Sequence, residues 1–207
     1  MKNYEWGIPP YEENRPLRVC LMVSRKKDNK DLEGFTERRK SFVTYKYMAE
    51  LEAEFEAFVN TGMPGEFCRM YLSVNTRDEK KVKKELIKLL IDDFDNPAPV
   101  VNMPYLMAKV AGLAAKKECA AESKWMIDFD SEDAECLNAF LDDLAYIEKK
   151  SGLTHKLGKT PHGYAIVVER GFDARLADGT ILFEKWKDVA TLKRDDLLCV
   201  EWRESGK

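Results

Sequence analysis

Asp128 and Asp130 have the spacing of two carboxylates that together bind a divalent cation. They stand at the end of the apolar segment 124–130. Successive side chains of an extended strand point to opposite faces, so both carboxylates lie on one face and the apolar side chains between them on the other. Mg²⁺ and Mn²⁺ are bound by such carboxylates together with the phosphates of a substrate. The spacing therefore favours a metal site for phosphoryl transfer.

The two aspartates differ in how well a purely structural role explains them. Asp130, or the neighbouring Ser131, can cap a helix that begins near Glu132. Asp128 lies inside an otherwise apolar strand, where a carboxylate costs free energy unless it is paired, hydrated in a cleft or bound to metal. The functional interpretation is therefore stronger for Asp128 than for Asp130.

A third acid, Glu201, lies in the apolar run 197–202, on the face that strict alternation shares with Cys199. On this interpretation Glu201 completes a catalytic metal site with Asp128 and Asp130. The alternative is an exposed glutamate near the end of an edge strand.

The segment 158–164 precedes the expected strand 164–169 and is rich in groups that bind phosphate. It contains Lys159, Thr160 and His162, flanked by glycines that let a ligand approach the backbone closely. Such a loop suits a triphosphate. A plain β-turn explains its proline and glycines equally well.

Positive charge is densest between residues 25 and 40. Contact with nucleic-acid phosphates is one interpretation of this region, and a solvated loop is the other. Two further arginines lie near the alternating segment 69–75, whose polar face carries Arg69 and Tyr71. The candidate nucleic-acid-binding residues are Arg25, Lys26, Lys27, Arg69 and Arg77.

The composition excludes several common classes of site. Two histidines among 207 residues leave little material for a zinc site or a His-based triad. Neither a dinucleotide-binding glycine motif nor a P-loop is present. The five cysteines are widely spaced and are expected to be reduced. The chain has no apolar run long enough to span a bilayer and no signal-like start, so we expect a cytoplasmic protein without a membrane partner.

Apolar periodicity predicts an α+β protein with helices and strands in mixed order. We expect one compact domain over residues 1–207, with an irregular arm at 1–16, an N-terminal α/β portion at 17–67 and a catalytic portion at 68–203. The segment 172–193 shows neither the apolar periodicity of a helix nor that of a strand. Strands are expected at 17–23, 69–75, 124–130, 164–169 and 197–202, and helices at 47–60, 79–94, near 104–117 and at 132–149.

The order of these motifs resembles that of the archaeo-eukaryotic primase-polymerase superfamily. Met126-Ile127-Asp128-Phe129-Asp130 looks like its first motif, and Val200-Glu201 is placed like its third. The turn Thr160-Pro161-His162-Gly163-Tyr164-Ala165 looks like the Thr-Pro-x-Gly-Tyr-His form of small phage and plasmid members. The chain departs from this pattern at Ala165, where the family usually has its nucleotide-binding histidine, and His162 stands three residues earlier.

The resemblance covers residues 68–203 and implies an RRM-like sheet, mixed or antiparallel and covered by helices, beside an N-terminal α/β portion. It implies Mg²⁺ or Mn²⁺ at Asp128, Asp130 and Glu201, and a nucleoside triphosphate and single-stranded nucleic acid as ligands. The resemblance also implies replication proteins as possible partners. If the chain is phage-encoded, it works in the host cytoplasm.

The function that follows is a nucleotidyltransferase that adds nucleotides to a nucleic-acid strand, with Lys159, Thr160 and His162 at the phosphates. Ala165 and the basic region leave a second interpretation open, a catalytically inactive module that binds nucleic acid or protein on the same scaffold. A metal-dependent nuclease also fits clustered carboxylates.

Overall fold

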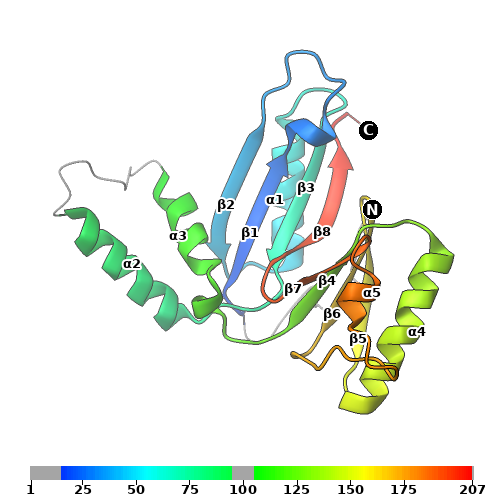
Figure 1. Cartoon of the computed structure of the whole chain (residues 1–207). Helices are drawn as coiled ribbons and strands as arrows, with labels where there is room; N and C mark the ends of the chain where they lie inside the picture. Colours follow the sequence, from blue (N-terminus) through cyan, green and yellow to red (C-terminus); the bar gives the residue numbers. More distant parts are fainter. Residues whose placement is uncertain (1–14, 95–104, 207) are drawn as a thin grey trace.

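Two four-stranded antiparallel sheets form the framework of the protein, whose computed structural model describes residues 15–94 and 105–206 (Figure 1). This architecture confirms the predicted α+β class. The first sheet has the order β2 (Arg38–Thr44), β1 (Arg18–Ser24), β3 (Phe67–Ser73), β8 (Leu197–Glu204). The second has the order β5 (His155–Thr160), β6 (Gly163–Val168), β4 (Trp125–Phe129), β7 (Ala190–Lys193).

Helix α1 (Met48–Asn60) covers one face of the first sheet. Its start is fixed by a capping box, in which the backbone N–H of Tyr47 donates to the Glu50 side chain. Its apolar residues recur at the spacing of one helix face and pack on alternate residues of β1 and β3. The helix residues buried in this way are Met48, Leu51, Phe55 and Val59.

Helix α4 (Ala134–Ser151) covers one face of the second sheet and packs on Ile127 and Phe129 of β4. The short helix α5 (Leu182–Lys185) adds Leu182 to the same core. The α4 N-cap is Asp133, whose carboxylate accepts from the backbone N–H groups of the first turn. Neither Asp130 nor Ser131 is this cap, so capping does not explain the position of Asp130.

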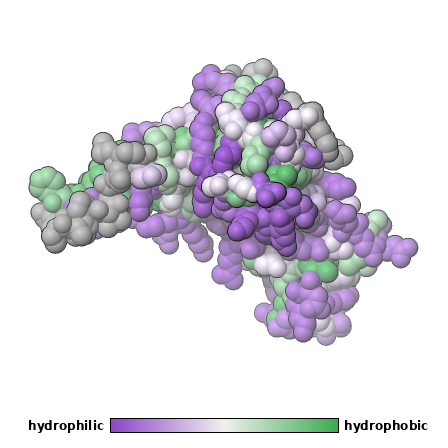
Figure 2. Space-filling model, turned by 90° about the horizontal axis from the view of Figure 1, so that it is seen from above, coloured by the Kyte–Doolittle hydropathy of each residue, from purple (hydrophilic) through white to green (hydrophobic). Residues whose placement is uncertain are grey.

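Helices α2 (Glu79–Phe94) and α3 (Leu106–Ala114), followed by the 3₁₀ turn η4 (Lys117–Cys119), form an arm beside the first sheet (Figure 1). Ala111 and Ala114 pack on Val19, which points away from the α1 face because it alternates with Cys20. The arm and the second sheet therefore lie on the same side of the first sheet. Seen from above, hydrophobic surface gathers at the outer end of this arm (Figure 2).

A buried polar junction holds the two sheets together. The Arg77 guanidinium donates both Nη groups to the Asp195 carboxylate at 2.7 and 2.9 Å. Asn75 donates to Asp195 and to the carbonyl of Lys124, and accepts from the Lys124 N–H. Asn75 follows β3, Lys124 precedes β4, and Asp195 lies between β7 and β8. The junction therefore fixes the points at which the chain passes between the sheets.

Strand pairing divides the chain differently from the predicted boundary at residues 67 and 68. Strands β3 and β8 belong to the first sheet, with β1 and β2, so the segment 68–203 supplies strands to both sheets. Strands β2, β5 and β7 were not predicted, and Arg38 to Lys40 lie on β2 rather than in a loop. The arm predicted at 1–16 lies outside the described residues except for Arg15 and Pro16.

All five cysteines are free thiols, as expected for reduced residues, and only Cys136 is partly exposed. Within residues 15–94 and 105–206, every helix is too short or too polar to cross a bilayer.

Replacing Arg77 tests the junction. In Arg77→Met, the Asp195 carboxylate is left buried without its cation, and we expect the free energy of unfolding to fall by about 3 to 5 kcal/mol. Urea denaturation followed by circular dichroism measures this change. Arg175→Met is the control, because the Arg175 side chain is 69% exposed. A stability equal to that of the wild type would contradict this role for Arg77.

Candidate functional site

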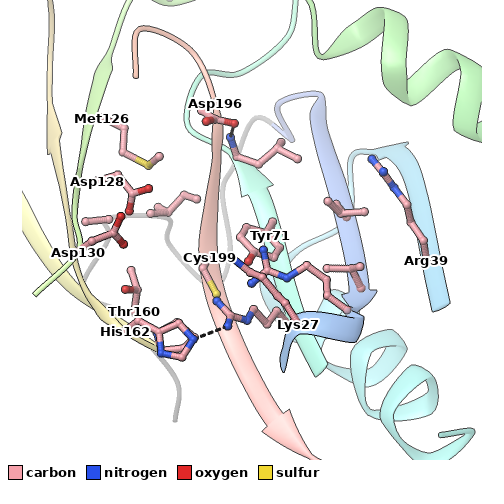
Figure 3. Close-up of a pocket in the computed structure, with 18 of the residues that line it drawn as sticks. Lys27, Arg39, Tyr71, Met126, Asp128, Asp130, Thr160, His162, Asp196 and Cys199 are labelled. Carbon is pink, nitrogen blue, oxygen red and sulfur yellow. Dashed lines mark hydrogen bonds between the residues drawn. The ribbon is translucent and has the colours of Figure 1, made fainter. Parts of the chain in front are cut away.

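A cavity of about 410 Å³ lies between the two sheets (Figure 3). Its floor is formed partly by the face of the first sheet that α1 leaves free, including Leu21 and Tyr71. Its opposite wall is formed by β4, by β6 and by the turn between β5 and β6. Charged side chains of opposite sign enter it from the two sides.

The acidic side consists of Asp128 and Asp130, from β4 and its end, and Asp196, from the segment before β8 (Figure 3). Asp128 pairs with Ala165 of β6 in the ladder. Alternation along β4 turns Met126 and Asp128 toward the cavity and the intervening apolar side chain toward α4. The predicted common face of Asp128 and Asp130 is therefore the wall of a cavity.

Burial, followed by the negative charge of Asp130, raises the pKa of the Asp128 carboxyl above its ordinary value. Asp196 raises this pKa further, and the ammonium groups of Lys193 and Lys27 oppose the shift. A carboxylate with a raised pKa lacks enough positive charge around it. An added cation would therefore stabilise the ionised form of Asp128.

Glu201 does not join these carboxylates. Across β3 and β8, Tyr71 pairs with Cys199, but the next residue, Met70, pairs with Glu201. Val200 is thus the extra residue of a β-bulge, which reverses the alternation on which the prediction was based. Glu201 consequently shares the α1 face with Met70. There it is 2% exposed and binds the Arg203 guanidinium, and it does not line the cavity.

The part of the chain that the structure describes contains no group of three or more Asp, Glu, His and Cys side chains placed to hold a metal ion. The carboxylates at the cavity fit a different arrangement. Mg²⁺ is usually held by one or two carboxylates, with waters and substrate phosphates as its other ligands. Asp128 and Asp130 are the residues that would supply these two ligands.

The basic side consists of residues from the first sheet and from the loop after β1. They are Arg25, Lys27, Arg39 and Arg69. Lys27 lies in the 3₁₀ turn η2 (Lys26–Asp28), while Arg39 lies on β2 and Arg69 on β3. This side brings four positive charges and one carboxylate, that of Glu37, to the cavity, opposite the aspartates.

Two buried side chains hold the η2 turn in place. Asn29 donates to Ser24, to the carbonyl of Arg25 and to the carbonyl of Phe67, and it accepts from the Phe67 N–H. The Asp28 carboxylate binds Arg25 at 2.9 Å and Arg69 at 2.6 Å, and these contacts hold the pKa of Asp28 below its ordinary value despite burial. The turn is thereby tied to β3.

Arg69 connects the two sides of the cavity. Its Nη2 lies 2.8 Å from Nε2 of His162, at the turn between β5 and β6. A guanidinium only donates, so this imidazole nitrogen accepts the hydrogen bond. Arg69 is 5% exposed and its Nε has no hydrogen-bond partner. A guanidinium at a cavity wall is suited to an anionic ligand, although the Nε of Arg69 is itself too buried to reach one.

Gly163 allows the turn that carries His162 to lie directly against β4. A Cβ atom at this position would stand 2.1 Å from the carbonyl oxygen of Phe129 and 2.9 Å from the N–H nitrogen of Ser131. These backbone atoms flank Asp130 in the chain. The glycine therefore sets the distance between the turn and the aspartates.

The structure brings most predicted residues to one cavity, but not all of them. Asp128, Asp130, Thr160, His162, Arg25, Lys27 and Arg69 line it. Lys26 does not line it. Lys159 pairs with Tyr164 on the face of the second sheet that α4 covers. Arg77 is buried in the junction with Asp195 and is not a phosphate ligand.

Besides Glu37, two charged cavity residues were not selected from the sequence. Arg39 belonged to the dense basic region, but only the β2 register places it beside Val23 on the cavity side. Asp196 is one of two adjacent aspartates before β8. The dense positive charge of residues 25–40 pointed to the region of Arg39, and the pair of adjacent aspartates pointed to Asp196. Only the strand register shows which residue of each group faces the cavity.

Ala165 occupies the position at which the resembled family has a histidine. Its side chain is buried beside Asp128 and lines the cavity. His162 is the histidine that reaches this cavity, and it does so from the turn. Comparisons of the chain with protein-family models, with curated proteins and with solved structures find no match.

Substituting Gly163 tests the placement of the turn. In Gly163→Ala, the new Cβ meets backbone atoms of β4 that cannot rotate away, so we expect a loss of about 2 to 3 kcal/mol in unfolding free energy. Gly112→Ala is the matched control, because nothing lies within 4 Å of a Cβ there. Since Gly112 lies inside α3, the control should gain up to about 1 kcal/mol. Equal effects of the two substitutions would contradict the proposed fit.

The raised pKa of Asp128 predicts a pH-dependent stability. The folded protein protonates this carboxyl more readily than the unfolded chain, so the ionised group destabilises the fold above the ordinary aspartate pKa of about 3.9 and has no such effect below it. We expect Asp128→Asn to melt at a higher temperature than the wild type at pH 7. The difference should shrink as the pH falls toward about 4.

Calorimetric melting over this pH range measures the effect. Asp142→Asn, at an exposed position of α4, is the control and should follow the wild type throughout. A lower melting temperature of Asp128→Asn at pH 7 would contradict the electrostatic argument.

Proposed function

We propose that this protein is a metal-dependent nucleotidyltransferase of the primase-polymerase type, which adds nucleotides to a nucleic-acid strand. One observation carries the proposal: aspartates from the second sheet face arginines and a lysine from the first sheet across a single cavity. A ligand that satisfies both sides must bring positive charge to the aspartates and negative charge to the arginines. A divalent cation bound to a triphosphate has this distribution of charge.

The cavity also has a suitable size and floor. Its volume of about 410 Å³ falls within the range of small-molecule sites. Between the charged walls lie Leu21, Val23, Tyr71 and Met126, which offer apolar contacts to a sugar or base. The cavity can therefore take a whole nucleotide rather than an inorganic ion alone.

The roles of the residues follow from their places around the cavity. Asp128 and Asp130 would hold the metal, which when bound lowers the pKa of an attacking hydroxyl and offsets charge on the leaving pyrophosphate. Arg69, Lys27 and Arg39 neutralise the phosphates. Because Arg69 is held by Asp28 and His162, its guanidinium is positioned before the ligand arrives.

The motif resemblance supports the same function. The Asp-x-Asp strand and the Thr-Pro-x-Gly-Tyr turn, which resemble primase-polymerase motifs, meet at this cavity through Asp128, Asp130 and Thr160. Asp196 lines the same cavity but is not placed to hold a metal together with Asp128 and Asp130, so the proposal has no third carboxylate ligand in place of Glu201. Ala165 favours the second candidate, an inactive module that binds the same ligand without transferring a nucleotide.

Ligand binding tests the charge arrangement. We expect the wild type to bind a nucleoside triphosphate in the presence of Mn²⁺, and Asp128→Asn to bind it at least about tenfold more weakly, because a ligand of the metal is lost while the side-chain shape is kept. Isothermal titration calorimetry with each component alone and with both together measures the coupling. Asp142→Asn serves as control. Equal affinity of Asp128→Asn and the wild type would contradict the proposal.

A primer-template assay with the same variants distinguishes the possible activities. Lengthened strands that disappear in Asp128→Asn are the expected result. Shortened strands would indicate a nuclease, and tight binding without any product would indicate the inactive module. Either of these two outcomes would overturn nucleotide addition.

A further inference from the structure

Helix α2 has two apolar faces, and within residues 15–94 and 105–206 only one of them packs against other elements. Val82 is buried beneath α3, and Leu86 and Leu89 are partly buried. The second face carries Ile87, Leu90, Ile91 and Phe94, which we call the outer stripe of α2. These residues follow the spacing i, i+3, i+4, i+7, so they form one continuous line along the helix.

The outer stripe is unusually exposed for apolar side chains. Its exposed fractions are 56% for Ile87, 42% for Leu90, 61% for Ile91 and 90% for Phe94. The arm that carries it extends away from both sheets (Figure 1), and hydrophobic surface is visible at its outer end (Figure 2). A line of large apolar side chains at helical spacing is a sign of a protein interaction surface.

We propose that the outer stripe is a dimerisation surface, on which a second copy of this chain packs its own outer stripe in antiparallel orientation. The stripe is symmetric about the midpoint between Leu90 and Ile91. A twofold axis at that point places Ile87 opposite Phe94 of the other copy. The stripe therefore matches itself when reversed, as a twofold interface requires. This inference does not depend on the proposed nucleotidyltransferase function.

The charges beside the stripe favour the same orientation. Lys88 and Asp92 lie one turn apart on one flank of the stripe, and Lys88 also binds Glu85 within the helix at 2.5 Å. In an antiparallel pair, the Lys88 of one copy lies beside the Asp92 of the other. Opposite charges thus meet along this one edge of the interface, because the twofold axis brings the same flank of both copies together.

The lysines of the first half of α2 disfavour a parallel pair. Lys80, Lys83 and Lys84 continue the line of the outer stripe toward the start of the helix, and all three are exposed. In a parallel pair each would face its own copy, with a cost from like charges in contact. In the antiparallel pair they extend past the end of the partner's stripe.

The interface spans only residues 87–94, about two helical turns. Such a small surface predicts a dimer that forms and dissociates with concentration, rather than an obligate one. We therefore expect the sedimentation coefficient of the wild-type protein to rise with concentration in analytical ultracentrifugation.

Leu90→Asp tests the surface, and Tyr146→Asp is a matched control because both side chains are 42% exposed and both lie on helices. We expect Leu90→Asp to remain monomeric at all concentrations and Tyr146→Asp to dimerise like the wild type. A wild-type protein that stays monomeric up to millimolar concentration, or a Leu90→Asp protein that still dimerises, would overturn the proposal.

Cysteine cross-linking tests the orientation, in a Cys136→Ser background that removes the one partly exposed native thiol. Ile91→Cys lies next to the twofold axis and should form a disulfide-linked dimer on oxidation. Ile87→Cys alone should not, because the two copies of residue 87 are about 10 Å apart along the helix axis. Ile87→Cys combined with Phe94→Cys should cross-link. A cross-link through Ile87→Cys alone would show a parallel pair and overturn the antiparallel arrangement.

Discussion

The buried ion pair between Arg77 and Asp195 is the interaction on which the candidate site depends most. With Asn75 it joins the segments after β3, before β4 and between β7 and β8, so it sets how the two sheets face each other. Apolar contacts act with this junction, because Met126 of β4 and Ala165 of β6 pack in the core cluster of the first sheet. The orientation of the two sheets that they fix together is the one in which the cavity exists.

Charge separation between the sheets is the second constraint. The carboxylates of β4 and the guanidinium groups of β2 and β3 would neutralise each other as ion pairs if the sheets lay closer together. Instead Arg69 is held by Asp28 and His162, and Asp128 keeps a raised pKa. The carboxylate of Asp128 is therefore not fully balanced by the cations around it, which is a property of binding sites rather than of packed cores.

Much of the fold could be predicted from apolar period alone. Helices α1, α2 and α4 and strands β1, β3, β4, β6 and β8 each carry a continuous apolar pattern. Strand β2 escaped prediction because it begins with Arg38, Arg39 and Lys40, and β5 because Leu157 is its one large apolar residue. Which strands pair, and therefore which sheet each joins, depends on contacts between distant residues that no local pattern contains.

Prediction of the site residues from local sequence patterns was limited in the same way. The common face of Asp128 and Asp130 follows from strand geometry and was predictable. The position of Glu201 was not, because one extra residue, Val200, reverses the faces of β8. Arg77 looked like a free cation in the sequence, and only the approach of Asp195 from 118 positions away makes it part of the core.

The most direct test of the metal–nucleotide site is a crystal structure with Mn²⁺ and a non-hydrolysable nucleoside triphosphate, with diffraction recorded at the manganese absorption edge. The account predicts an anomalous peak between Asp128 and Asp130, with phosphate density beside Arg69 and Lys27. A peak only at other carboxylates, or phosphates bound away from this cavity, would contradict it.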